Sequence, residues 1–130
     1  MAGAIAVLYE TPTEYARYTV ADGTAIPKGT ILQLTDPNTA SASSAEDEIC
    51  AGIAMYEKVA SDGTTEITAA LNGVWGLKSS AAIDVGADVG INGLNEIKTA
   101  TTLDREKGWT MGTALETSAG AVVMKIRVRV

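Results

Sequence analysis

The sequence predicts an all-β protein: a small β-barrel or sandwich of many short strands, built from two pseudo-repeats and preceded by an extended N-terminal arm. Short runs of alternating apolar and polar residues are separated by glycine-containing turn signals, as in half-buried strands. No apolar stripe with helical spacing runs for a useful length. The motif Ala-Ile, two spacer residues and Gly occurs at 25–29 and again at 82–86, 57 positions later.

The same offset of 57 relates further pairs of residues along the chain. It aligns 18–20 with 75–77, and it aligns Gly63 with Gly120. Glycine coincidences alone prove little, because glycine is common in any chain. The ordered series carries more weight, since self-similarity at one offset is typical of a duplicated structural unit.

The length and composition predict one globular domain. The chain has 130 residues, of which 46% are hydrophobic, enough for a buried core. We expect an extended arm at 1–14 and a single β domain at 15–130, with pseudo-repeats at about 15–71 and 72–130. The chain has no Phe and many Ala residues, so this core is thin. Thin cores are often completed by a partner surface or by oligomerisation.

The N-terminal arm has two interpretations. One is a frayed terminus. The other is a strand added to another subunit, in which Ile5, Val7, Leu8 and Tyr9 contact the partner. Burying these side chains stabilises by about 6–10 kcal/mol at most, and ordering the segment costs a similar amount. One arm therefore binds weakly, and several arms on one oligomer are needed for firm attachment.

The first pseudo-repeat is expected to contain short strands joined by turns. The predicted strands cover residues 15–20, 30–34, 49–57 and 64–71. Gly29 is expected to form the turn before the second of them, with positive φ. Residues 35–48 are predicted to be a polar loop, in which Ser44 and Asp47 cap a single helical turn.

The second pseudo-repeat is expected to follow the same plan. The predicted strands cover residues 74–78, 88–91, 94–98, 109–116 and 121–130. Asn72-Gly73 and Asn92-Gly93 are predicted hairpin turns, and Gly86 is predicted to form the turn equivalent to that of the first repeat. Residues 101–108 read as one capped helical turn that ends at glycine.

Charge and composition limit the possible partners. The net charge is −6 and the pI is about 4.5, which argues against a nucleic-acid partner. Neither a signal peptide nor a membrane span is predicted. Lys125, Arg127 and Arg129 share one side of the last predicted strand. They are candidates for contact with an acidic partner. Alternatively, they belong to a solvated sheet face, where their charge discourages association with other chains.

The residues predict no catalytic, cofactor-binding or metal site. There is no histidine and only one cysteine, Cys50, which excludes the histidine-based nucleophilic sites and a closed zinc site. Cys50 is read as a small buried hydrophobe. A two-carboxylate glycosidase lacks an evident carboxylate pair, and the acidic run at 46–48 lacks the ligand spacing of a calcium loop. Trp75 and Trp109 either anchor the core or form an exposed aromatic platform.

Several patterns of small residues lie at 51–54, 62–71, 73–75, 82–89 and 111–114. Together they resemble the head decoration, or capsid cement, proteins of tailed phages. The likeness to the general pattern of these proteins covers most of 15–130, and the likeness to the lambda-like members covers mainly the middle of the chain.

The resemblance implies a non-enzymatic protein without cofactors that binds the outside of an assembled viral head. Its implied partner is the major capsid protein, whose subunit seams it covers as a homotrimer, with the N-terminal arm pairing with capsid strands. Such a protein is made in the host cytoplasm and ends in the virion, without membrane or nucleic-acid contacts. The alternative is a β-sandwich carbohydrate- or receptor-binding module that uses Trp75 or Trp109.

Overall fold

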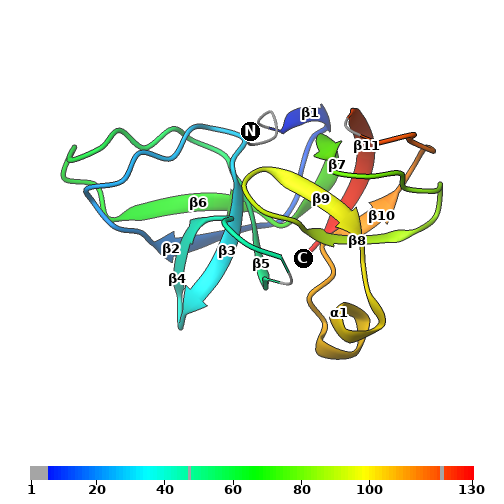
Figure 1. The fold of residues 1–130 in the computed structure, drawn as a ribbon. Helices are drawn as coiled ribbons and strands as arrows, with labels where there is room; N and C mark the ends of the chain where they lie inside the picture. The colour runs from blue at the N-terminus through cyan, green and yellow to red at the C-terminus, as the bar shows by residue number, and fades with distance from the viewer. Residues whose placement is uncertain (1–5, 47, 121) are drawn as a thin grey trace.

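A computed structural model describes residues 6–46, 48–120 and 122–130. The predicted contact residue Ile5 and the predicted capping residue Asp47 lie outside the described residues. The fold is all-β with one short helix, which confirms the predicted class. Figure 1 shows two β lobes side by side, one built from β2 to β6 and the other from β7 to β11.

The first lobe is a closed five-stranded barrel in the order β2-β4-β3-β5-β6. Its strands are β2 (Tyr15–Thr19), β3 (Ile31–Asp36), β4 (Thr39–Ala42), β5 (Cys50–Ala54) and β6 (Glu66–Ala70). β2 pairs antiparallel with β6 along its length and closes the barrel through a single parallel pair, Thr19 with Thr39, on β4. The predicted loop at 35–48 therefore contains a strand that the sequence analysis missed.

The second lobe repeats this connectivity. Its strands are β7 (Asn72–Ser79), β8 (Asp88–Ile91), β9 (Glu96–Thr99), β10 (Gly112–Ala114) and β11 (Val123–Arg129). β7 pairs antiparallel with β11 and parallel with β9, as β2 does with β6 and β4. The fold thus has the two repeat-like halves that were predicted. The exact division into an arm and one β domain stays a prediction.

The register between the halves differs from the predicted offset at one strand. Thr19 pairs with Thr39 and Glu66, and Lys78 pairs with Glu96 and Val123. Thr19 is therefore equivalent to Lys78, two residues beyond the offset of 57, and the predicted alignment of 18–20 with 75–77 is wrong. Local sequence similarity misled here because strand equivalence depends on cross-strand partners.

Part of the predicted arm is a strand of the protein's own sheet. β1 (Val7–Glu10) pairs antiparallel with β7, where Val7 lies opposite Gly76 and Leu8 opposite Trp75. The frayed-terminus interpretation is wrong for these residues, because their backbone pairs with β7 of the same chain. The physical reason is that β9 covers only the end of β7, at Lys78 and Ser79, and leaves the first half of that edge free for β1.

The predicted turns have mixed outcomes. Gly29 and Gly86 occupy equivalent turns with φ of 88° and 86°, and Gly93 has φ of 85° between β8 and β9. The Asn72-Gly73 hairpin is wrong, because β6 and β7 belong to different barrels and both residues lie in β7. Gly73 is needed there for another reason: a Cβ would lie 2.8 Å from the Glu10 carbonyl oxygen.

The predicted capped turn near the end of the chain is confirmed. Helix α1 (Thr102–Lys107) begins after Thr101, whose hydroxyl accepts a hydrogen bond from the Asp104 N–H while the Asp104 carboxylate accepts one from the Thr101 N–H. It ends at Gly108 with φ of 73°. The other predicted turn is wrong, since Ser44 begins no helix and Glu46 forms a bridge to Asn92.

The two barrels share a hydrophobic core. Trp75, which is 2% exposed, belongs to a buried cluster that also contains Ile31 and Ile53 from the first barrel. A second cluster fills the first barrel itself and includes Leu32 and Ala69. Because one cluster crosses the junction, burial at the junction stabilises both halves together.

Candidate partner-binding face

The outer side of strands β1, β7 and β11 carries the most distinctive surface of the chain. Along β11 the side chains alternate as predicted: Met124, Ile126 and Val128 are buried at 2% exposure or less. The residues between them point outward and are exposed; they are Val123, Lys125, Arg127 and Arg129. The last strand thus presents three cations on a chain whose net charge is −6.

Gly76 lets apolar side chains from two other strands meet over β7. A Cβ at Gly76 would lie 2.8 Å from Tyr9 Cε2, 3.0 Å from Val123 Cγ1 and 3.6 Å from Val7 Cβ. The three side chains cover this position but remain 45–52% exposed. A side chain at Gly76 would push them apart, so glycine here shapes the surface as well as the strand.

The basic residues border this apolar group. Lys125 Nζ lies 5.0 Å from the centroid of the Tyr9 ring, within cation–π range. Arg129 donates to Thr113 Oγ1 at 3.2 Å, whereas Arg127 makes no ion pair among the described residues. We call this surface the β1–β11 face. It consists of Val7, Tyr9, Val123, Lys125, Arg127 and Arg129.

The structure therefore brings together two groups of predicted contact residues that are far apart in the sequence. Val7 and Tyr9 from the arm lie beside the cations of the last strand, because β7 holds β1 on one edge and β11 on the other. Leu8 lies opposite Trp75 and is 39% exposed. Val123 was not predicted as a contact, although its place in the alternation of β11 puts it on this side.

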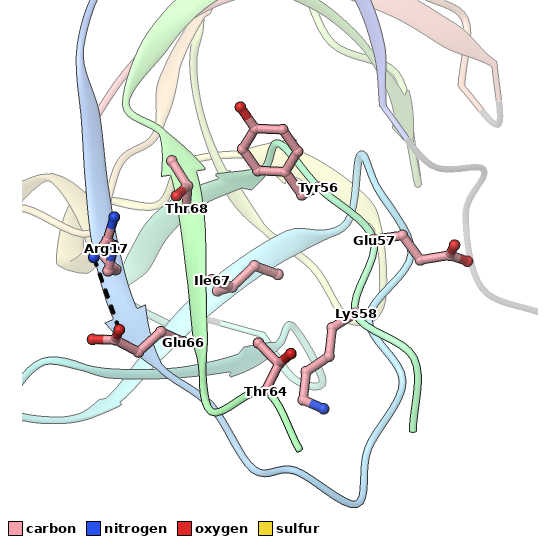
Figure 2. A pocket seen from close by; sticks show the side chains of 8 residues that line it. All are labelled: Arg17, Tyr56, Glu57, Lys58, Thr64, Glu66, Ile67 and Thr68. Atoms are coloured by element: carbon pink, nitrogen blue, oxygen red, sulfur yellow. Dashed lines mark ion pairs between the residues drawn. The ribbon is translucent and has the colours of Figure 1, made fainter. Parts of the chain in front are cut away.

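A pocket of about 320 Å³ lies on the first barrel, between β6 and the segment after β5. It is lined by Arg17, Tyr56, Glu57, Lys58, Thr64, Glu66, Ile67 and Thr68. Figure 2 shows the carboxylates of Glu57 and Glu66 on opposite sides of this pocket, with Glu66 paired to Arg17 at 3.9 Å. The carboxylates do not converge on a common point, so the pocket lacks the arrangement of a two-carboxylate catalyst.

Lys58 serves the structure of the first barrel. Its side chain is 1% exposed, and Nζ contacts Asp62 Oδ1 at 3.0 Å and Asp22 Oδ1 at 3.2 Å. It also donates to the carbonyls of Asp22 and Val59. Burial lowers the pKa of Lys58, but the hydrogen bonds to Asp62 and Asp22 outweigh it and raise that pKa overall. The ammonium is fully engaged in pairing, which leaves no donor for a ligand.

Asp62, the carboxylate that pairs with Lys58, makes the free energy of unfolding depend on pH. The Thr64 N–H and the Lys58 ammonium lower the pKa of Asp62 from 3.8 to about 2. A carboxyl group whose pKa is lower in the folded state stabilises the fold at pH values above its ordinary pKa. This stabilisation is lost as the pH falls from 3.8 towards 2. We expect the free energy of unfolding to fall through this window in urea titrations, with a shallower decline in Asp62→Asn. An equal slope in the variant would contradict this assignment.

Neither a reactive thiol nor an exposed Trp75 platform is present. Cys50 is buried, and burial raises the pKa of its thiol to about 12. The thiol donates to the Gly52 carbonyl at 3.9 Å. Trp75 donates from Nε1 to the Asn72 carbonyl at 3.1 Å and is buried. The alternative module that relied on Trp75 as a platform is therefore wrong for that residue, while Trp109 is half-buried after α1.

The described residues provide no evident metal centre. Among them, no group of three histidine, cysteine, aspartate or glutamate side chains could hold an ion. Glu46, from the acidic run, accepts from Lys98 Nζ at 3.0 Å. Across the same part of the chain, no helix has the length and apolar character needed to cross a membrane.

Comparison with known proteins gives a likeness in fold. No family model and no curated protein matches the chain. The chain is similar to a solved structure, the N base of the head fiber protein gp8.5 of bacteriophage phi29. The TM-score is 0.57 at 14% identity, and the match covers 88% of this chain and 94% of that chain.

The coverage of this match defines which part of the fold is shared. A match over 88% of the chain extends over parts of both barrels, and the likeness therefore concerns the fold as a whole. At 14% identity the likeness shows the fold, while the side chains of the β1–β11 face belong to this sequence.

Proposed function

We propose that this chain is a structural protein of a tailed-phage head. In this proposal it decorates the outside of the assembled shell, binds across the seams between major capsid protein subunits, and stabilises the shell. The observation that carries the proposal is the paired-barrel fold shared with the head fiber base of phi29. The resemblance of the small-residue patterns to decoration proteins supports the same assignment.

The β1–β11 face is the proposed capsid contact. Its centre is apolar and its rim is cationic, an arrangement that suits a complementary surface with an apolar centre and acidic surroundings. Full burial of a valine or tyrosine side chain stabilises by roughly 1.5–3 kcal/mol. Since Val7, Tyr9 and Val123 are already about half-buried, each adds about 1 kcal/mol on docking.

Such a contact is weak for a single copy. A few kcal/mol does not exceed the cost of immobilising a protein on a surface. Several copies joined in one oligomer raise the effective concentration of each contact. We therefore include a homotrimer on the shell in the proposal. No catalysis and no cofactor are part of this function, and the acidic net charge of −6 suits neither nucleic acid nor an anionic membrane.

Binding to heads tests the proposal directly. Purified protein is mixed with purified, expanded heads of the phage that encodes it, and the particles are separated from free protein by sedimentation. We expect saturable binding, density over the shell at three-fold positions in electron micrographs, and a higher temperature of head disruption. Absence of co-sedimentation, or binding at the tail vertex alone, would overturn the proposal.

A further inference from the structure

The two barrels differ at one equivalent edge. In the second barrel, the edge of β7 facing away from β11 is covered by β1 at 74–76 and by β9 at Lys78 and Ser79. In the first barrel, β4 pairs with β2 only at Thr19. Within the described residues, no strand pairs with this edge of β2 between Tyr15 and Tyr18. The first barrel therefore lacks the strand that β1 supplies to the second.

The backbone of β2 presents hydrogen-bonding groups along this edge. Thr19 donates its N–H towards the open side, to Asn38 at 2.8 Å, whereas Val20 donates towards the β6 side, to Thr65 at 2.9 Å. Successive N–H groups of a strand point to opposite edges. The N–H groups of Tyr15 and Arg17 therefore point outward at the open edge, in the direction that Val74 and Gly76 use to pair with β1.

Side-chain burial shows the same difference. Tyr18 packs against the core of the first barrel but is only partly buried, and Ala16 on the same side of β2 is also only partly buried. The equivalent residues of β7, Trp75 and Leu77, are 2% and 1% exposed. In the first barrel the described strands leave the edge of β2 uncovered at the position where β1 covers the edge of β7 in the second barrel. No proline or bulge interrupts 15–18 to block the edge.

We propose that the open edge of β2 binds an extended segment of another protein chain, antiparallel to β2, as β1 binds β7. The segment places an apolar side chain opposite Ala16, where Leu8 lies opposite Trp75 in the second barrel. On the outer side it places an acidic residue beside Arg17, whose pairing with Glu66 at 3.9 Å is more than half exposed and therefore weak.

The occupant is a partner protein and not the chain's own β1. β1 is already paired with β7, and moving it to β2 would uncover one edge to cover another. Backbone pairing gives affinity and the side chain opposite Ala16 gives selectivity, as in other cases of strand addition. Strand addition at this edge does not require the partner to be a capsid protein.

A peptide test uses the full chain and a probe of known pairing behaviour. The probe is the blocked hexapeptide Ala-Val-Leu-Tyr-Glu-Thr, which is the sequence of residues 6–11. Amide hydrogen exchange is followed by NMR at millimolar peptide. We expect exchange of the Arg17 N–H to slow by at least about tenfold, while exposed loop amides do not change. Unchanged exchange at Arg17 would overturn the proposal.

Two matched variants separate backbone pairing from side-chain contact. Arg17→Ala keeps the outward N–H and should retain most of the peptide binding. Arg17→Pro removes that N–H without removing a bond to β6, and should lose peptide binding. If Arg17→Pro fails to fold, a peptide N-methylated at alternate positions replaces it and should not bind wild-type protein. Equal binding of the methylated peptide, or loss in Arg17→Ala equal to that in Arg17→Pro, would contradict strand addition.

Discussion

Replacing Trp75 with alanine is expected to lower the free energy of unfolding by about 3–5 kcal/mol. The side chain is 2% exposed and packs in the cluster that crosses from the second barrel into the first. Its removal leaves a cavity that the neighbouring strands cannot close without shifting their register. Because a domain of this size is stable by only about 5–15 kcal/mol, the loss is a large part of the total. Urea denaturation followed by far-ultraviolet circular dichroism measures it.

Trp109→Ala is the matched control. Trp109 is half-buried beside the short helix, so its loss should cost less than half as much. Both proteins are expected to unfold in one transition, since the barrels share core residues such as Ile31 and Ile53. Equal losses in the two variants would contradict the assigned role of Trp75. Separate transitions for the two halves would contradict the shared core.

The second large effect is expected at the β1–β11 face. Tyr9→Ser together with Val123→Ser should weaken head binding by at least about tenfold, since each change removes about 1 kcal/mol of burial and several copies act together. Both side chains are about half-exposed, so folding should be little affected. Substitution is preferable to deletion of the arm, because β1 pairs with β7 and its loss would uncover that edge. Quantitative sedimentation with heads measures the change.

Exposed apolar residues elsewhere provide the control for this experiment. Val85→Ser with Leu103→Ser changes side chains of 61% and 48% exposure that lie outside the face, and should leave head binding unchanged. Lys125→Glu should weaken binding most at low ionic strength, because salt screens exposed charges. Equal losses in the control pair, or unchanged binding in the Tyr9 and Val123 variant, would remove this face from the proposed function.

Most strands could be predicted because the signal for a strand is local. Alternation along β11 puts Met124, Ile126 and Val128 in the core and the cations outside, and the sequence shows this period directly. The capped helix α1 was equally visible, since Thr101 and Asp104 satisfy each other's backbone over a single turn. β4 escaped prediction because Thr39, Ala40, Ser41 and Ala42, although they alternate, include no large apolar side chain, and alanine is not typical of strands.

The candidate face was only partly visible in the sequence. Its basic residues were predicted as a group because they share one strand, and Val7 and Tyr9 were predicted because they share the arm. That the two groups meet follows from the pairing of β7 with both β1 and β11, which join segments more than a hundred residues apart. Gly76, whose missing side chain makes room for the contact, carried no signal of its own in the sequence.

Residue type and short-range spacing are enough to predict the all-β class, the repeated plan, most strand positions and the absence of histidine-based chemistry. Only the tertiary structure shows which strands pair, how the two barrels close through β4 and β9, where β1 docks, and which edge of β2 no described strand covers. Strand pairing joins residues that are distant along the chain. Its outcome depends on which edges remain free after the barrels form, and no local pattern records that.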